Sequence, residues 1–177
     1  MGGGTWTNTP PVPYDWGTTG FALGACNPLL LHDGGVLVHN CSSGDWYKLT
    51  PSSNGDYAAG TWQAIASLPS NYWPTYHASA VLPDGRVIIQ GGEYNGSCAG
   101  LEDQPVWTNL GAIYDPVSNV WTPVNPPASR GSDAGCGGAT SRIGDAASTL
   151  LANGRLLLAA CCAHPPSNAI LDPLTLT

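Results

Sequence analysis

The sequence predicts an all-β fold made of three consecutive four-stranded antiparallel units. One pattern occurs three times, in segments 28–39, 79–90 and 148–159: an apolar run, a turn containing Asp-Gly or Asn-Gly, and a second apolar run. The 177 residues include 23 Gly and 16 Pro, and only 10% are charged. Such a composition is typical of short strands joined by tight turns. No segment keeps the 3.6-residue apolar period of a helix, so we expect no helix.

Each of the three segments is predicted to form a β-hairpin. The turns fall at 33–35, 84–85 and 153–154, where Asp, Asn and Gly tolerate the positive φ that tight hairpin turns need. The runs on both sides of each turn are almost continuously apolar. We therefore expect both faces of each hairpin to be buried, as in stacked sheets.

A second hairpin pattern follows each of the first, at 45–63, 112–122 and 169–177. It consists of a strand, a turn containing Asp-Pro or Thr-Pro, and, in the first two cases, a strand that opens near a Trp. Proline ends the first strand and presets φ in the turn. Each unit thus holds four antiparallel strands, which is the content of one β-propeller blade. The expected blades span about 22–68, 74–126 and 143–177, after a short linker at 1–5.

The spacing of the repeats fits this assignment. The turn glycines Gly34, Gly85 and Gly154 lie 51 and 69 residues apart. Insertions at 95–109 and 128–142, rich in Gly, Ser, Asp and Cys, account for the longer interval.

The second unit resembles the kelch motif, a repeat of about 50 residues. Val87–Gly92 supplies an apolar strand and a Gly-Gly pair, and Tyr114 and Trp121 follow at the expected places. Asn40-Cys41 and Ala160-Cys161 stand in place of Gly-Gly in the other two units. The chain is also similar to secreted kelch proteins related to the galactose oxidase propeller. Those are larger closed rings, so the resemblance implies that this chain forms about half of one.

The order of strands predicts how a ring would close. By analogy with Val120–Thr122, the third unit should end on a Trp strand after Thr177, whereas Thr5-Trp6-Thr7 precedes the first unit. We expect the segment 5–10, through Trp6 and Thr7, to complete a third unit. Because propellers have about four to eight blades, three cannot close. Two copies would give a six-bladed homodimer, while a different second half or a fragment of a larger ring are the alternatives.

The six cysteines fall on or beside one face of the predicted blades. We expect Cys26 with Cys41, and Cys98 with Cys136, to form disulfides, although connectivity does not follow from sequence. Six free or buried thiols are the alternative. Disulfides would indicate an extracellular parent protein.

Binding is expected on the face that carries the long loops between strands and blades. Exposed aromatic rings there could stack on sugar rings, although packing between blades is the simpler role for them. The expected partner on this face is a carbohydrate or a protein. The candidate residues are Trp73, Tyr76, His77, Glu93, Tyr94, Trp107 and Asp145.

No metal, cofactor or catalytic activity is expected. His39, His77 and His164 belong to different units, without zinc-site spacing. Tyr76 resembles the radical-site tyrosine of the galactose oxidase family, and Cys26 lies one residue away from the matching cysteine position. The family's other copper ligands have no counterpart. The predicted role is therefore a non-enzymatic, self-assembling scaffold, and the alternative is a carbohydrate-binding or copper-oxidase-like fragment.

Charge excludes two classes of partner. The net charge is −7, and no basic patch is present to neutralise phosphates. We therefore expect no binding to nucleic acid or to anionic membranes. The apolar runs are too short to span a bilayer, and the first four residues lack the features of a signal peptide.

Overall fold

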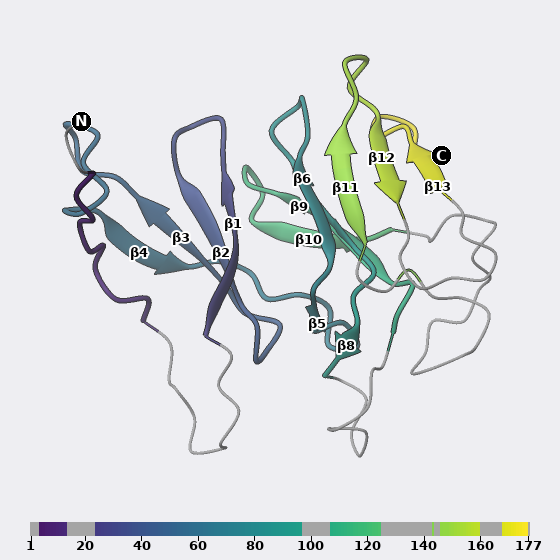
Figure 1. Cartoon of the computed structure of the whole chain (residues 1–177), viewed down its shortest axis with the longest axis horizontal. Helices are drawn as coiled ribbons and strands as arrows, with labels where there is room; N and C mark the ends of the chain where they lie inside the picture. Colours follow the sequence, from purple (N-terminus) through teal and green to yellow (C-terminus); the bar gives the residue numbers. More distant parts are fainter. Residues whose placement is uncertain are drawn as a thin grey trace.

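The computed structural model describes residues 4–13, 24–96, 107–124, 143, 146–159 and 168–176. All the regular structure in these ranges is β, which confirms the predicted fold class. Three antiparallel sheets follow one another along the chain and fan out side by side (Figure 1). Within these ranges, no helix is long and apolar enough to cross a membrane.

The first two sheets have four strands each, and strands adjacent in the sheet are antiparallel. The first sheet comprises β1 (Ala25–Leu30), β2 (Val36–Asn40), β3 (Trp46–Thr50) and β4 (Thr61–Ala64). The second comprises β6 (Ala78–Val81), β7 (Val87–Gln90), β9 (Gly111–Asp115) and β10 (Val120–Pro123).

The third sheet has three strands among the described residues, in the order β11-β12-β13. A short ribbon, which the sequence did not predict, joins two segments that flank the first hairpin of the second sheet. The third sheet comprises β11 (Ala147–Leu150), β12 (Leu156–Ala159) and β13 (Asn168–Leu171), and the ribbon comprises β5 (Pro74–Thr75) and β8 (Tyr94–Asn95).

The repeated turns share one geometry, seen clearly at 82–86. The Gly85 amide donates to the Leu82 carbonyl at 2.9 Å, and the Leu82 amide donates to the Arg86 carbonyl at 2.7 Å. Gly85 has a φ of +89°. This is a three-residue loop in which a type I turn is followed by a left-handed glycine. The turns at 31–35 and 151–155 repeat the same bonds.

The side chain of the residue before the turn glycine accepts a backbone hydrogen bond. Asp and Gly both tolerate the positive φ of such turns, and in this turn only the glycine adopts it. The Asp84 carboxylate instead accepts a hydrogen bond from the Arg86 amide at 3.1 Å. Asn153 serves the Arg155 amide in the same way at 3.2 Å. The side chain therefore satisfies an amide that the turn leaves without a strand partner.

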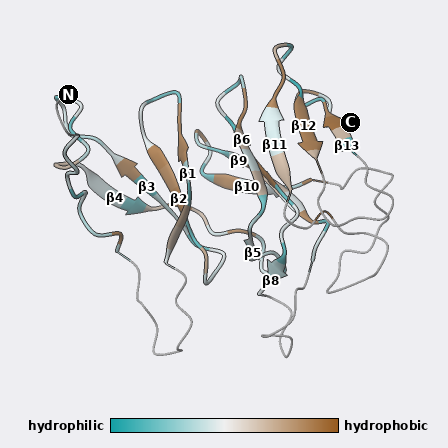
Figure 2. Cartoon of the chain, in the orientation of Figure 1, coloured by the Kyte–Doolittle hydropathy of each residue, from teal (hydrophilic) through white to brown (hydrophobic). Residues whose placement is uncertain are grey.

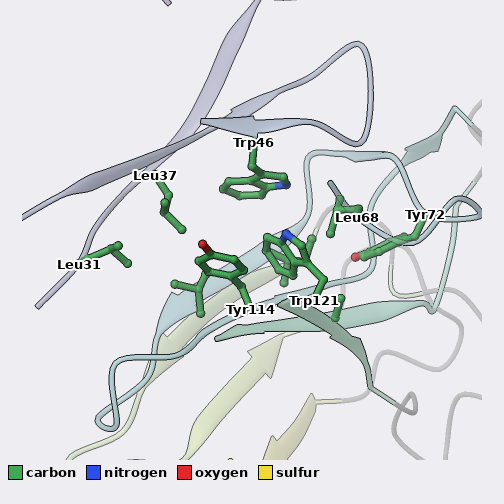
Figure 3. Packing of buried hydrophobic residues seen from close by; sticks show 10 residues of the cluster. Leu31, Leu37, Trp46, Leu68, Tyr72, Tyr114 and Trp121 are labelled. Carbon is green, nitrogen blue, oxygen red and sulfur yellow. The ribbon is translucent and has the colours of Figure 1, made fainter. Parts of the chain in front are cut away.

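Aromatic packing holds the first sheet against the second (Figure 3). Trp46 of β3 is fully buried, and its ring centroid lies 5.3 Å from that of Trp121 in β10. Trp121 packs in turn on Tyr114 at 5.1 Å and donates its indole N–H to the Ala66 carbonyl at 2.9 Å. Burying a large apolar side chain contributes roughly 1.5–3 kcal/mol, so this cluster dominates the interface.

A polar seam links the innermost strands of all three sheets, β1, β6 and β11. The Ser148 hydroxyl in β11 donates to the Ser79 carbonyl in β6 at 3.0 Å and accepts from the Ser79 amide at 3.1 Å. The Ser79 hydroxyl donates to the Asn27 side-chain oxygen in β1 at 3.0 Å. Apolar packing of Leu82 and Ile88 against Leu156 closes the second interface beside the seam. These hydrogen bonds and contacts therefore fix the positions of the three sheets relative to one another.

Replacing Gly85 by Ala should lower the free energy of unfolding by about 1 kcal/mol or more, because alanine is strained at positive φ. The added Cβ would meet only ordinary contact, with His32 Nδ1 at 3.6 Å, so the cost is conformational. Gly85→Asn should cost less, since asparagine tolerates this region. Urea unfolding of the three proteins measures the difference. Equal losses for both substitutions would contradict the turn geometry.

Candidate functional site

The β5–β8 ribbon lies at the end of the fan opposite the repeated hairpin turns (Figure 1). Asn95 is buried and ties it together: its side-chain oxygen accepts from the Trp73 amide at 2.8 Å, and its side-chain N–H donates to the Asn71 carbonyl at 3.0 Å. The Gly91-Gly92 pair lets the chain before β8 pass close to Pro74 in β5. A Cβ on Gly92, whose φ is +134°, would lie 2.6 Å from Pro74 Cβ.

Three of the predicted binding residues are exposed aromatics at this ribbon. Tyr76 is 59% exposed and Tyr94 is 36% exposed, and their rings meet edge to face at 6.1 Å between centroids. Trp73, 37% exposed, precedes β5 on the same ribbon. Tyr76 has a φ of +53°, an unusual conformation for a bulky residue. The ribbon therefore presents a small aromatic platform to solvent.

The other predicted binding residues do not add an exposed ring to this platform. Glu93 and Trp107 are only half-exposed, and the Glu93 amide donates to the Thr75 carbonyl at 3.0 Å. His77 turns inward between the first two sheets. Asp145 lies outside the described residues.

The predicted Cys26–Cys41 disulfide is present and ties the start of β1 to the residue after β2. Its Cα atoms are 5.9 Å apart, and 15 residues of sequence separate the two cysteines. Closing a loop of this length stabilises the folded state by about 3 kcal/mol in the chain-entropy treatment. Cys26 is thereby bonded to Cys41 rather than placed with Tyr76. Cys98 and Cys136 lie outside the described residues, so that pairing stays a prediction.

A buried histidine lies directly against this disulfide. His39 of β2 pairs with Cys26 across the strands, and its Nδ1 lies 3.7 Å from the Cys26 sulfur. Its Nε2 lies 2.9 Å from the Ser43 carbonyl oxygen, which can only accept. Nε2 therefore carries the proton, and Nδ1 directs a lone pair at the sulfur. The ring stacks on Trp46 with centroids 4.8 Å apart.

A second histidine packs against the first. The His77 ring meets His39 edge to face, with centroids 5.3 Å apart. His77 Nδ1 lies 3.3 Å from the Ala78 carbonyl, and Nε2 is buried without a hydrogen-bond partner. The sequence placed these histidines on separate units and did not predict that they meet. Each stands beside an inter-sheet surface, His39 at the end of β2 and His77 just before β6, and only packing of the two sheets joins them.

Burial keeps both imidazoles neutral. Desolvation, reinforced by the repulsion that a protonated His77 would exert on a protonated His39, lowers the pKa of His39 from 6.5 to about 3, although the Ser43 carbonyl opposes the shift. Desolvation likewise lowers the pKa of His77 to about 4, against the opposing effect of the Ala78 carbonyl. The pair therefore joins two uncharged rings, a disulfide and an indole in one interior cluster.

The outward face of the first sheet is an apolar groove of about 570 Å³. Its lining includes Val36, Val38 and Trp62 on the side of the sheet that faces away from the second sheet. Residues 4–13 form no strand, and part of this segment borders the groove, where Trp62 donates its indole N–H to the Pro10 carbonyl at 2.8 Å. Trp6 is fully exposed.

The outward face of the third sheet is also partly apolar. In the strand register, Leu157 lies opposite Thr149 on one side and Ile170 on the other. Leu156 and Leu158 point the other way, into the interface with the second sheet. Ile170 is left 53% exposed. Figure 2 shows apolar character along β2 at one end of the fan and along β12 and β13 at the other.

Comparison with known proteins identifies the fold type. No family model matches the sequence, and no curated protein matches it. The structure is similar to that of the protein YjhT, with a TM-score of 0.51 and 17% identity over 85% of this chain and 35% of that chain. It is also similar to a fungal alcohol oxidase of the AA5 family in complex with copper, with a TM-score of 0.55 and 16% identity over 80% of this chain and 28% of that chain.

These likenesses concern the fold alone, and they are of the propeller type. The chain spans about a third of the length of each of the two solved chains. The predicted β-propeller relation is therefore confirmed at the level of the fold.

Stability should fall as the pH is lowered from about 6.5 toward 5, because the unfolded chain takes up protons at histidines that stay neutral when folded. Each histidine adds a slope of up to about 1.4 kcal/mol per pH unit. Carboxylates titrate mainly below this window. Urea unfolding across the window measures the slope, and His39→Phe should reduce it by about half. A free energy of unfolding that stays constant would contradict the burial of the pair.

Proposed function

We propose that this chain is a non-enzymatic, self-assembling scaffold: a kelch-type half-propeller that closes a six-bladed ring with a second copy of itself. The observation that carries the proposal is the pair of apolar outward faces, one on the first sheet and one on the third. The second sheet is covered on both sides by its neighbours. In the described part of the chain, the first and third are each covered by another sheet on one side only.

The two outward faces are suited to each other. The groove on the first sheet is lined mainly by aliphatic and aromatic side chains, and Leu30 beside it is 62% exposed. The third sheet offers Leu157 and the exposed Ile170. Neither face carries a charged side chain among these residues. Packing one on the other would repeat the sheet-on-sheet burial already seen twice inside the chain, with a similar hydrophobic contribution per area.

The N-terminal segment supports the same arrangement. The third sheet has one strand fewer than the other two among the described residues, so β13 is its edge. An exposed edge favours pairing with a strand from another chain. Trp6 lies in a segment without regular secondary structure, and its side chain is fully exposed to solvent. In the ring, Trp6 and Thr7 of one copy pair with β13 of the other.

A second copy of the chain can cover both apolar outward faces without any other protein. Propellers close with about four to eight blades, so two three-bladed arcs related by a two-fold axis give a permitted ring. The contact is head to tail, and it closes after two copies. Each copy covers both open faces of the other, and no apolar face is left over.

Sedimentation velocity should give twice the 18.2 kDa chain mass. Ile170→Glu should shift the protein to a monomer, because it places an unpaired charge in the buried joint. The matched control is Val117→Glu, at a residue that is 94% exposed in the β9–β10 turn, outside both faces. It should leave the mass unchanged. A monomeric parent protein, or dissociation by both substitutions alike, would contradict the proposal.

The aromatic platform at the β5–β8 ribbon favours a second candidate function, carbohydrate binding. Tyr76 and Tyr94 expose adjacent rings on one ribbon, and Trp73 is nearby. Aromatic faces stack on the apolar faces of sugar rings, and the phenolic hydroxyls can hydrogen-bond to the sugar. The platform lies away from the outward faces of the first and third sheets, so binding and ring closure are compatible.

A glycan array followed by titration calorimetry tests this second function. Tyr94→Ala should weaken binding of a captured glycan roughly tenfold, the effect of losing one ring contact. Tyr94→Phe keeps the ring and should retain most of the affinity. An unchanged affinity in Tyr94→Ala would contradict the proposal that the platform binds carbohydrate.

A further inference from the structure

The cluster at the Cys26–Cys41 disulfide contains three groups that ligate metals. One ligand atom from each of Cys26, His39 and Cys41 lies within 4.8 Å of the others. His39 is buried, Cys41 is nearly so, and Cys26 is half-buried. The scaffold role does not use these groups, and the disulfide alone does not require a histidine lone pair aimed at one of its sulfurs.

We propose that reduction of the disulfide converts this cluster into a Zn²⁺ site, with Cys26, Cys41 and His39 as ligands. Disulfide and metal site are alternative states of the same two sulfurs. A water molecule takes the fourth position of the ion, as in other sites with three protein ligands.

The geometry of His39 carries the proposal. In tetrahedral zinc sites, Zn–S and Zn–N bonds of about 2.3 and 2.05 Å place sulfur and nitrogen about 3.6 Å apart. Here the Cys26 sulfur and His39 Nδ1 are 3.7 Å apart. The opposite ring nitrogen is held by the Ser43 carbonyl at 2.9 Å. Metal-binding histidines are oriented by such a bond, which fixes the tautomer and leaves the other nitrogen free to bind the ion.

The sulfurs need only a small rearrangement. Two zinc-bound thiolates lie about 3.8 Å apart, against about 2 Å in a disulfide. The Cα atoms, 5.9 Å apart, belong to residues tied at the same end of one sheet. Rotation of the two side chains is enough to open this distance. Cys26 is only half-buried, so the cluster is not sealed off from solvent.

The ring that packs against His39 carries a buried nitrogen without a hydrogen-bond partner. His77 packs on His39, and its Nε2 is buried without a hydrogen-bond partner. A buried orphan nitrogen costs about 1–3 kcal/mol. A water bound to the ion would offer a donor to this nitrogen if it lay within hydrogen-bond reach.

The conversion is chemically balanced. A dithiol transfers two electrons and two protons to the Cys26–Cys41 bond, which gives two thiols and leaves the reductant as a cyclic disulfide. Zn²⁺ then binds the two sulfurs as thiolates and the lone pair of His39 Nδ1. The two thiol protons pass to solvent, so binding weakens as the pH falls.

Co²⁺, which reports its ligands by absorption, is the probe for the test. The full chain is reduced with a dithiol, freed of reductant without air, and titrated with Co²⁺ and then Zn²⁺. We expect a cobalt spectrum with thiolate charge-transfer bands and tetrahedral ligand-field bands, which Zn²⁺ abolishes. The unreduced chain serves as a control of identical sequence and should give no such bands from this site.

Two variants assign the ligands. Cys41→Ser keeps Cys26 and the other four cysteines, and His39→Phe keeps all six and a ring to stack on Trp46. Each should weaken Co²⁺ binding roughly a hundredfold or more, since losing even an outer partner of a metal ligand costs 10–100-fold. Circular dichroism confirms that each variant is folded. A reduced chain without cobalt bands, or bands of full strength in Cys41→Ser, would overturn the proposal.

Discussion

The structure depends on one constraint: each sheet carries apolar side chains on both faces, and these side chains must be covered. The central strands contain Val, Ile and Leu without a polar side, so a single sheet cannot stand alone in water. Trp46 and Trp121 meet where the first sheet covers the second, and Leu156 lies where the second covers the third. The same requirement at the two outer sheets leads to the proposal of a second copy.

Local chemistry made the fold class predictable. The turn at 82–86 needs a glycine at positive φ and an acceptor one residue before it, and the sequence displays both as Asp84-Gly85. The Pro that follows Asp115 marks the second hairpin in the same direct way. These signals act within a few residues, so they can be read without knowledge of the partner strands. The short β5–β8 ribbon lacks such a signal, because its two strands are 20 residues apart and the Asn95 side chain secures it through bonds to the segment just before β5.

The candidate sites were predictable only in part, for a related reason. Trp73 and Tyr94 were predicted as exposed rings because they lie in loops, and both are exposed. His77 lies in the same loop but turns inward, and the choice depends on the pocket that Trp46 and His39 form on the neighbouring sheet. The Cys26–Cys41 bond was one of two expected disulfides, suggested by the place of both cysteines at one end of neighbouring strands, and it is present. Its contact with a histidine lone pair depends on the tautomer fixed by Ser43, which no local pattern encodes.

Hydrogen exchange at β13 tests the central claim most directly, because this strand is the edge that a second copy would cover. The inner strand β9, paired on both sides with β7 and β10, is the internal reference. If a second copy supplies the missing neighbour, amides of β13 should be protected nearly as well as those of β9 in concentrated protein. They should lose that protection on dilution. Amides of β13 that exchange quickly at every concentration would contradict the account.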